Sequence, residues 1–289
     1  MRILVLRGGA LGDFLVTLPA LALLRQRWPD ARIELVGNRL AAALAVSGGL
    51  VNAVHPQHEA RWSALYGPAP LPPALTDWLA EFDLVLNYWP DPDQELTRRF
   101  PVRAGQNFLH AAALPTLAPA AAHYCAPLRS LGLSPDRLVY PLRTPAPEPR
   151  LIALHPGSGS TRKNWPAGRW LALARWLQDE RKLTVLVISG EAEPTTLLAG
   201  VGVHLHDRPL TEVADQLARC RLFVGHDSGI SHLAAATGTP SVLLFGPTDP
   251  ALWAPPAPNV QVLQRGPDLA VLSFTEIQQA VAAALSDQS

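Results

Sequence analysis

The sequence predicts an α/β protein with two doubly wound domains, each built on a parallel sheet. The chain has 289 residues, and at roughly 100–200 residues per domain two domains are expected. Short apolar segments typical of strands alternate with segments of helical periodicity in both halves. A proline-rich stretch, residues 144–150, predicts a stiff linker between a first domain over residues 1–143 and a second over residues 151–289.

The first 40 residues predict a βαβ unit. Residues 3–6 form an apolar run typical of a buried strand, residues 14–28 are apolar at helical spacing, and residues 32–36 predict a second strand. Such a unit implies a parallel sheet with a right-handed crossover. The other elements expected in this domain are strands at residues 51–54 and 84–86 and a helix at about residues 120–131.

The same alternation returns after the linker. The elements expected there are strands at residues 151–154, 184–188, 222–224 and 241–245, and helices at residues 167–179, 211–219, 230–237 and 275–285. Whether the last helix stays in this domain or packs back on the first is left open. Two such domains are expected to face each other across a cleft, where ligands bind at the carboxyl ends of the strands.

Composition excludes several classes of protein. Hydrophobic residues make up 48% of the chain and charged residues 17%, which argues against disorder. Twenty-four basic and 24 acidic residues leave no net charge, so no nucleic-acid partner is expected. The N-terminus does not resemble a signal peptide, and no segment approaches the ~18–20 apolar residues of a membrane span. We therefore expect a soluble cytoplasmic protein in which Cys125 and Cys220 are buried free thiols.

A glycine-rich loop, RGGALGD at residues 7–13, follows the first predicted strand. Gly9 and Gly12 allow close backbone approach to a ligand, and the next helix offers unpaired N–H groups. The loop is not the dinucleotide fingerprint, because Arg7 takes the place of its first glycine. Asp13 is either a helix-start carboxylate favoured by the helix dipole or a general base beside the cleft.

A second loop, HPGSGSTRKNWP at residues 155–166, follows the first strand of the second domain. Its small residues around Ser158, followed by Arg162 and Lys163, suit a diphosphate, and a flexible surface loop is the alternative. It is not a Walker loop, which would end in Gly-Lys-Ser/Thr. Lys163 is one of two lysines in an arginine-rich chain, which favours a role for its compact charge.

A further loop, VGHDSG at residues 224–229, leads from a predicted strand into a helix. The backbone N–H groups near Ser228 and Gly229 would point at an anion, with the helix dipole behind them. Adjacent His, Asp and Ser residues cannot fold onto one another as a hydrolase triad, so serine hydrolase chemistry is not expected.

Three other segments carry weaker signals. Glu191 and Glu193 lie after a predicted strand, where carboxylates bind ribose hydroxyls or begin a helix. The Asp-Pro-Asp of residues 91–93 resembles a metal motif but is expected to be a solvated turn. His204 and His206 lack an apparent third ligand, so no metal site is expected.

Together these loops resemble glycosyltransferase family 9, the ADP-heptose heptosyltransferases of lipopolysaccharide core assembly. The matching blocks lie in both halves and in order: RGGALGDFLVTLPALALLRQRWPDARIELV, HPGSGSTRKNWPAGRWLALARWL, SGEAEP and FVGHDSGISHLAAATGTPSVLLFGPTDPALWAPP. The resemblance implies the GT-B architecture, two Rossmann-like domains facing across a cleft. It also implies inverting, metal-independent transfer of a sugar, a heptose, from ADP-heptose to a hydroxyl of a glycan or glycolipid, with no cofactor.

The resemblance also assigns roles by position. Asp13 would be the catalytic base for the acceptor hydroxyl, and Lys163 would stabilise the departing diphosphate. Glu193 would hold the ribose, with Glu191 as the weaker candidate. The donor-binding residues that the resemblance implies are Gly9, Gly12, Ser158, Lys163, Glu193, Asp227, Ser228, Gly229 and His232.

The chain is short for the family in the half that contacts the acceptor. Arg61, Arg98 and Arg99 are the candidate acceptor contacts, with an ordinary solvated surface as the alternative. Two other functions stay open: a nucleotide-sugar-binding protein without transfer activity, and a GT-B-like sugar-nucleotide epimerase. The sequence leaves peripheral contact with the inner face of the membrane open, and it does not fix the acceptor or the oligomeric state.

Overall fold

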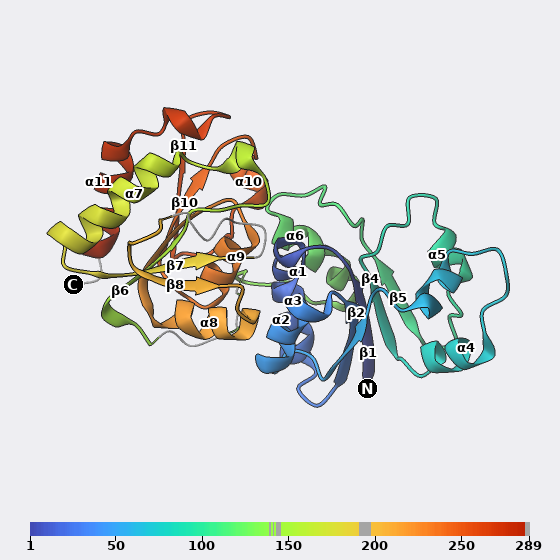
Figure 1. The fold of residues 1–289 in the computed structure, drawn as a ribbon. Helices are drawn as coiled ribbons and strands as arrows, with labels where there is room; N and C mark the ends of the chain where they lie inside the picture. The colour runs from blue at the N-terminus through green and yellow to red at the C-terminus, as the bar shows by residue number, and fades with distance from the viewer. Residues whose placement is uncertain (139, 141, 143–145, 191–197, 287–289) are drawn as a thin grey trace. The chain divides into compact units, whose positions relative to one another are not determined.

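The chain divides into two compact units, Met1–Val139 and Tyr140–Ser289. A computed structural model describes residues 1–138, 140, 142, 146–190 and 198–286. Each unit has one parallel sheet with helices packed beside it (Figure 1). The sequence placed the end of the first domain at residue 143, and the second sheet begins at Glu148, inside the expected linker of residues 144–150.

The first unit has a five-stranded sheet in the order β3-β2-β1-β4-β5. Its strands are β1 (Arg2–Arg7), β2 (Arg32–Gly37), β3 (Ala53–Pro56), β4 (Leu84–Asn87) and β5 (Asn107–His110). All neighbouring strands are parallel. The direction of winding reverses between β1 and β4, and crevices for ligands form at the carboxyl ends of strands at such a point.

The helices of the first unit are short. They are α1 (Leu11–Leu15), α2 (Leu18–Arg27), α3 (Arg39–Ser47), α4 (Pro73–Ala80), α5 (Glu95–Arg99) and α6 (Ala120–Cys125), with 3₁₀ turns at Ala60–Leu65 and Ala126–Leu131. The single helix predicted over residues 14–28 is wrong, because the chain breaks into α1 and α2. Pro19 explains the break, since it has no N–H and its ring clashes with the carbonyl four residues earlier.

The second unit has a six-stranded sheet in the order β11-β10-β9-β6-β7-β8. Its strands are β6 (Glu148–His155), β7 (Thr184–Ser189), β8 (Val203–His206), β9 (Cys220–His226), β10 (Ser241–Phe245) and β11 (Val260–Gln264). All neighbours are again parallel. This is the strand order of a complete dinucleotide-binding fold, and winding reverses between β6 and β9.

The helices of the second unit cover both faces of its sheet. They are α7 (Ala167–Arg175), which continues into a π-helical turn at Trp176–Glu180, α8 (Leu210–Arg219), α9 (Gly229–Ala236), α10 (Pro250–Trp253) and α11 (Phe274–Ser286). The last helix, α11, packs in the second unit, where Ile277, Val281 and Leu285 join a core formed with α7 and the strands.

Two predictions from the sequence concern the burial of the cysteine thiols and the absence of membrane-spanning segments. Cys125 and Cys220 are free and buried, as predicted, and burial raises the pKa of each thiol to about 12. None of the helices in the part of the chain that the structure describes has the length and apolar character of a membrane span.

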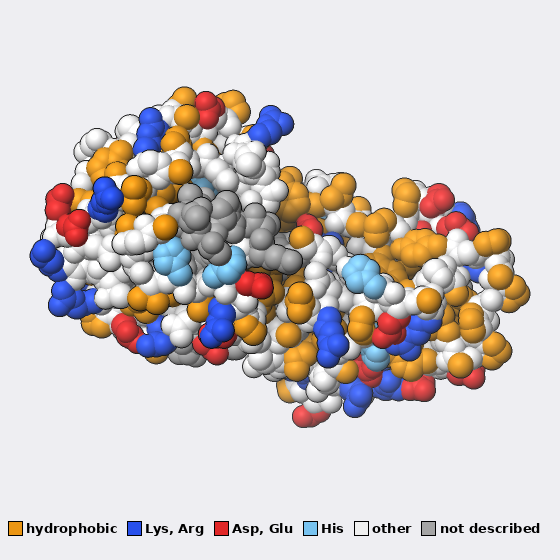
Figure 2. Space-filling view, viewed as in Figure 1, with side chains coloured by type: hydrophobic (Ala, Val, Ile, Leu, Met, Phe, Trp, Pro, Cys, Tyr) orange, Lys and Arg blue, Asp and Glu red, His pale blue; other side chains and the backbone are white. Residues whose placement is uncertain are grey.

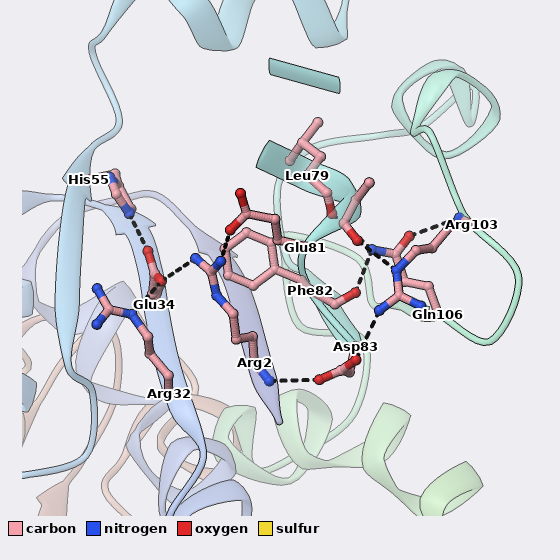
Figure 3. Close-up of polar contacts among 11 residues, drawn as sticks. Arg2, Arg32, Glu34, His55, Leu79, Glu81, Phe82, Asp83, Arg103 and Gln106 are labelled. Atoms are coloured by element: carbon pink, nitrogen blue, oxygen red, sulfur yellow. Dashed lines mark hydrogen bonds and ion pairs between the residues drawn. The ribbon is translucent and has the colours of Figure 1, made fainter. Parts of the chain in front are cut away.

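A buried carboxylate, Glu34 of β2, lies at the centre of a polar cluster in the first unit (Figure 3). Its oxygens accept hydrogen bonds from Arg2, Arg32 and His55, each at 2.8 Å. Burial alone would raise the pKa of Glu34, but these hydrogen bonds outweigh it and lower the pKa from 4.5 to about 2. The charged form therefore stabilises the folded unit.

This shift predicts an acid-dependent loss of stability. A carboxyl pKa that is lower in the folded state contributes stability above pH 4.5 and loses it as the pH falls toward 2. We expect wild-type protein to exceed Glu34→Gln in free energy of unfolding by about 3 kcal/mol near pH 6, with the difference shrinking in acid. Urea unfolding at a series of pH values measures it. Glu212→Gln, which removes an exposed pair with Arg208, is the control, and an equal pH profile for both variants would contradict the assignment.

Candidate functional site

The reversal point of the second sheet brings two of the predicted loops together. β6 and β9 are adjacent parallel strands, with His155 of β6 paired in register with Gly225 of β9. The loop of residues 156–166 leaves the carboxyl end of β6, and Asp227 and Ser228 leave the carboxyl end of β9. In open α/β sheets this is the edge where ligands bind.

An ion pair joins these two loops. The Nζ atom of Lys163 lies 2.6 Å from Oδ2 of Asp227, and the Thr248 hydroxyl donates to the same oxygen at 2.7 Å. The side chain of Lys163 is 29% exposed and that of Asp227 10% exposed. The structure thus places side by side a cation and a carboxylate that the sequence had assigned to one donor site.

The N-terminus of α9 lies next to this pair in the chain. Ser228 is the N-cap, and its hydroxyl accepts a hydrogen bond from the Ser231 N–H at 3.4 Å. Gly229 is the first helical residue, so its N–H belongs to the first turn, where a helix offers donors to an anion. His232, one turn later, is buried, and its backbone N–H donates to the Ser228 carbonyl at 3.3 Å.

Ser158 braces the loop that carries Lys163. Its Oγ lies 2.7 Å from both the Ser160 carbonyl and Oδ1 of Asn164. These contacts join the middle of the loop to its later part and curl the chain ahead of Lys163. Glu193, and Glu191 beside it, lie outside the residues that the structure describes.

His226, the last residue of β9, has no role predicted from the sequence. Its buried ring accepts hydrogen bonds at Nε2 from the Trp165 N–H at 2.8 Å and the Trp170 indole at 3.2 Å. Burial lowers the pKa of His226 to about 4, and burial together with His226 lowers the pKa of neighbouring His155 to about 3. Both rings are therefore neutral near pH 7. Trp165 and Trp170 were the signal in the sequence that could have pointed to a buried polar partner. That partner, His226, could not be identified because it lies about 60 residues away in the chain.

Gly9 lies in the loop after β1 in the first unit, and Gly12 and Asp13 lie in the first turn of α1. Gly9 has a φ of +103°, and a Cβ there would come within 2.7 Å of the Asp13 Cβ, so the turn requires glycine. Oδ2 of Asp13 accepts a hydrogen bond from the Ala10 N–H at 3.0 Å. The helix-start role is therefore present, while the side chain stays 39% exposed and open to solvent.

The buried Arg7 side chain holds the segment after β1 through hydrogen bonds to backbone carbonyls. It is 4% exposed, and its Nε donates to the Asp13 carbonyl at 3.0 Å. Other guanidinium nitrogens donate to the Ala113 carbonyl and to the Tyr124 hydroxyl, whose ring lies 4.4 Å from the Arg7 Cζ. The arginine that breaks the dinucleotide fingerprint thus holds the backbone of Asp13 in place.

Two of the three candidate acceptor arginines are engaged within the first unit. Arg61 stacks on Trp62, with 4.2 Å from Cζ to the ring, and pairs with Glu59 at 2.7 Å. Arg99 donates to the Ala64 and Ala69 carbonyls. Arg98 is exposed. On the face that Figure 2 shows, basic and acidic side chains lie interspersed over both units.

The weaker sequence signals have structural explanations. Asp91 is not a solvated turn acid: it is buried, and its oxygens accept hydrogen bonds from the N–H groups of Leu96 and Thr97 at the start of α5. His204 lies 3.2 Å from the Val201 carbonyl, and His206 lies 3.0 Å from the Ser189 hydroxyl. Within the described ranges, no three His, Cys, Asp or Glu residues are grouped so that they could hold a metal ion.

Sequence comparisons find similarity to heptosyltransferases. The model of glycosyltransferase family 9 (heptosyltransferase) matches residues 130–271. Lipopolysaccharide heptosyltransferase 1 of Pseudomonas aeruginosa is 34% identical over 108 residues, 35% of this chain and 30% of the relative. Lipopolysaccharide heptosyltransferase 1 of Salmonella typhimurium is 37% identical over 114 residues, 36% of this chain and 34% of the relative. Over residues 130–271 this chain is similar to the heptosyltransferases of glycosyltransferase family 9.

Solved structures share the fold of this chain over nearly its whole length. Each of the two sequence matches, by contrast, spans about a third of the relative. E. coli heptosyltransferase WaaC with ADP aligns with a TM-score of 0.78 at 23% identity, covering 98% of this chain and 100% of that one. A glycosyl transferase family 9 protein from Veillonella parvula aligns with a TM-score of 0.79 at 19% identity, covering 99% and 97%. These likenesses confirm the predicted GT-B fold class.

The anchoring role of Arg7 predicts a large effect on stability. Arg7→Met leaves the Asp13 and Ala113 carbonyls without these donors, so we expect the free energy of unfolding to fall by about 2–4 kcal/mol. Arg98→Met, at an exposed position, is the control and is expected to change it by less than about 0.5 kcal/mol. Urea unfolding measures both, and equal small effects would show that Arg7 does not anchor the loop.

Proposed function

We propose that this chain transfers a heptose from ADP-heptose to a hydroxyl of a glycan or glycolipid. The relatives are named as lipopolysaccharide heptosyltransferases, and structural neighbours were solved with ADP and with ADP-2-deoxy-2-fluoro heptose. The observation that carries the proposal is the pairing of Lys163 with Asp227 at the reversal point of the second sheet, one residue before the N-cap of α9.

The donor site is built to receive a diphosphate. A diphosphate placed beside Lys163 would exchange the Asp227 carboxylate for phosphate oxygens as partners of the ammonium group. The first-turn N–H groups that begin with Gly229 would add donors, with the helix dipole behind them. These groups stabilise the negative charge that develops on the leaving diphosphate, and we assign that stabilisation to them rather than to a metal ion.

Asp13 is the proposed base. In one displacement, the acceptor oxygen bonds to the anomeric carbon while the bond from that carbon to the diphosphate oxygen breaks, which inverts the configuration. The acceptor proton passes to Asp13, whose 39% exposed side chain can reach solvent and a bound hydroxyl. No covalent intermediate forms, because the acceptor itself displaces the leaving group.

The remaining site assignments complete the proposal. Glu193 would bind the ribose, while Gly9 and Gly12 would let the loop after β1 approach the substrates closely. Arg98 would be the exposed acceptor contact, since Arg61 and Arg99 are engaged elsewhere. We place the reaction in the cytoplasm, where a glycolipid acceptor would be met at the inner face of the membrane.

One observation favours a second function, a nucleotide-sugar-binding protein without transfer activity. Oδ2 of Asp13 accepts the Ala10 N–H, which alone is a sufficient structural reason for a carboxylate at this position. The two functions share a donor site and differ in what the Asp13 carboxylate does.

Charge removal at Lys163 and Asp227 tests the donor site. We expect Lys163→Met to raise the Kd for ADP by roughly 10–100-fold, because a charge-assisted hydrogen bond is worth about 1.5–3 kcal/mol. Asp227→Asn should also change the Kd, since it frees the lysine and removes a negative charge. Lys182→Met, at the other lysine, is the matched control, because its position is exposed. Calorimetric titration measures binding, and wild-type affinity in Lys163→Met would contradict the site.

Substitution at Asp13 tests the chemistry. We expect Asp13→Asn to lower kcat by about 10²–10⁴-fold while the Kd for ADP stays within about twofold, because loss of a general base slows the reaction without removing donor contacts. The exposed turn residue Asp30, as Asp30→Asn, is the control. Release of ADP in the presence of a panel of glycans and glycolipids is the assay. Full activity in Asp13→Asn would remove its role as base, and no turnover by wild-type protein with any acceptor would favour the binding function.

A further inference from the structure

His226 holds both ends of the loop that carries Lys163. Its ring is fully buried at the end of β9, and its Nε2 lies 2.8 Å from the backbone nitrogen of Trp165. Its Nδ1 lies 3.2 Å from the carbonyl oxygen of Gly157. Gly157 and Trp165 flank the segment that contains Lys163, so a single side chain fixes the distance across the base of the loop.

The partners determine which ring nitrogen carries the proton. Both groups that contact Nε2, the backbone N–H of Trp165 and the indole N–H of Trp170, can only donate, so Nε2 must accept. The proton therefore lies on Nδ1, which donates to the Gly157 carbonyl. This neutral tautomer satisfies all three contacts at once. In the charged ring, Nε2 would also carry a proton, and that N–H would face the two N–H donors of Trp165 and Trp170.

Aromatic packing keeps the ring from moving. The His226 and Trp170 rings meet edge to face at 5.1 Å and 87°, and Trp170 meets Trp165 at 5.5 Å and 85°. The Trp165 indole donates to the Leu272 carbonyl at 2.8 Å, which ties the end of the loop to the chain before α11. The loop end is thus held from two directions, and its position depends on His226.

We propose that His226 is a positioning residue for donor binding. By holding Gly157 and Trp165, it places the Lys163 ammonium beside Asp227, where the diphosphate is to bind. The side chain acts through Lys163, because its own polar atoms are buried against the loop. This inference rests on the proposed function and names a residue that sets donor affinity without touching the donor.

A double-mutant cycle on ADP affinity tests the inference. His226→Leu leaves two buried N–H groups without their acceptor, so the loop must rearrange. We expect its Kd for ADP to rise roughly tenfold or more, the equivalent of a lost hydrogen bond. If His226 acts through Lys163, the same substitution in the Lys163→Met background should change the Kd by less than about twofold.

Two further variants separate positioning from general stability. His226→Gln keeps an acceptor oxygen and an amide donor, so we expect it to retain most of the affinity. Val281→Ala shortens a buried side chain of α11 in the same core and should lower the Tm without changing the Kd. Should His226→Leu fail to fold, His226→Asn carries the same cycle, because its amide is too short to reach both ends of the loop.

The outcomes are distinct. Coupling between the two substitutions, together with rescue by His226→Gln, supports the inference. Wild-type affinity in His226→Leu, or an equal loss from it with and without Lys163, overturns the inference while leaving the donor site standing. Wild-type protein that binds no ADP overturns the proposed function, and this inference with it.

Discussion

The ion pair between Lys163 and Asp227 is the interaction on which the candidate site depends. The two residues are 64 positions apart, and they meet because β6 and β9 are adjacent strands at the point where the sheet reverses its winding. Asp227 holds the partly buried ammonium group of Lys163 at the carboxyl edge of the sheet through its Oδ2 atom. The hydroxyl of Thr248, in the loop after β10, donates a hydrogen bond to the same oxygen. If a diphosphate replaces Asp227 as the partner of Lys163, the carboxylate keeps the hydrogen bond from the Thr248 hydroxyl.

Both units fix the loop at the edge of the sheet with a buried polar side chain from the end of a strand. Arg7 ends β1 and donates to the carbonyl of Asp13, while His226 ends β9 and joins Gly157 to Trp165. In each case the side chain satisfies backbone groups that a loop would otherwise leave unpaired. These segments can therefore be rich in glycine and small residues and still hold one shape.

The sequence predicted the buried parts of this fold better than its edges. β1, β6, β9 and β10 were found because their apolar runs are buried on both sides, as expected for central parallel strands. β8 and β11 lie at the edges of the second sheet and carry exposed polar residues, so they have no such run. Lys163 and Asp227 were assigned to one donor site by the resemblance to glycosyltransferase family 9, and in the structure each follows a central strand. The roles of Arg7 and His226 could not be predicted, because hydrogen bonds to residues such as Ala113 and Gly157 depend on how distant segments pack.

A crystal structure of the protein with ADP would show whether the ion pair between Lys163 and Asp227 opens to receive a diphosphate. We expect phosphate oxygens within hydrogen-bonding distance of Lys163 Nζ and of the first N–H groups of α9, with the contact from Lys163 to Asp227 longer than the present 2.6 Å. An ADP molecule bound elsewhere, with that contact unchanged, would contradict this expectation.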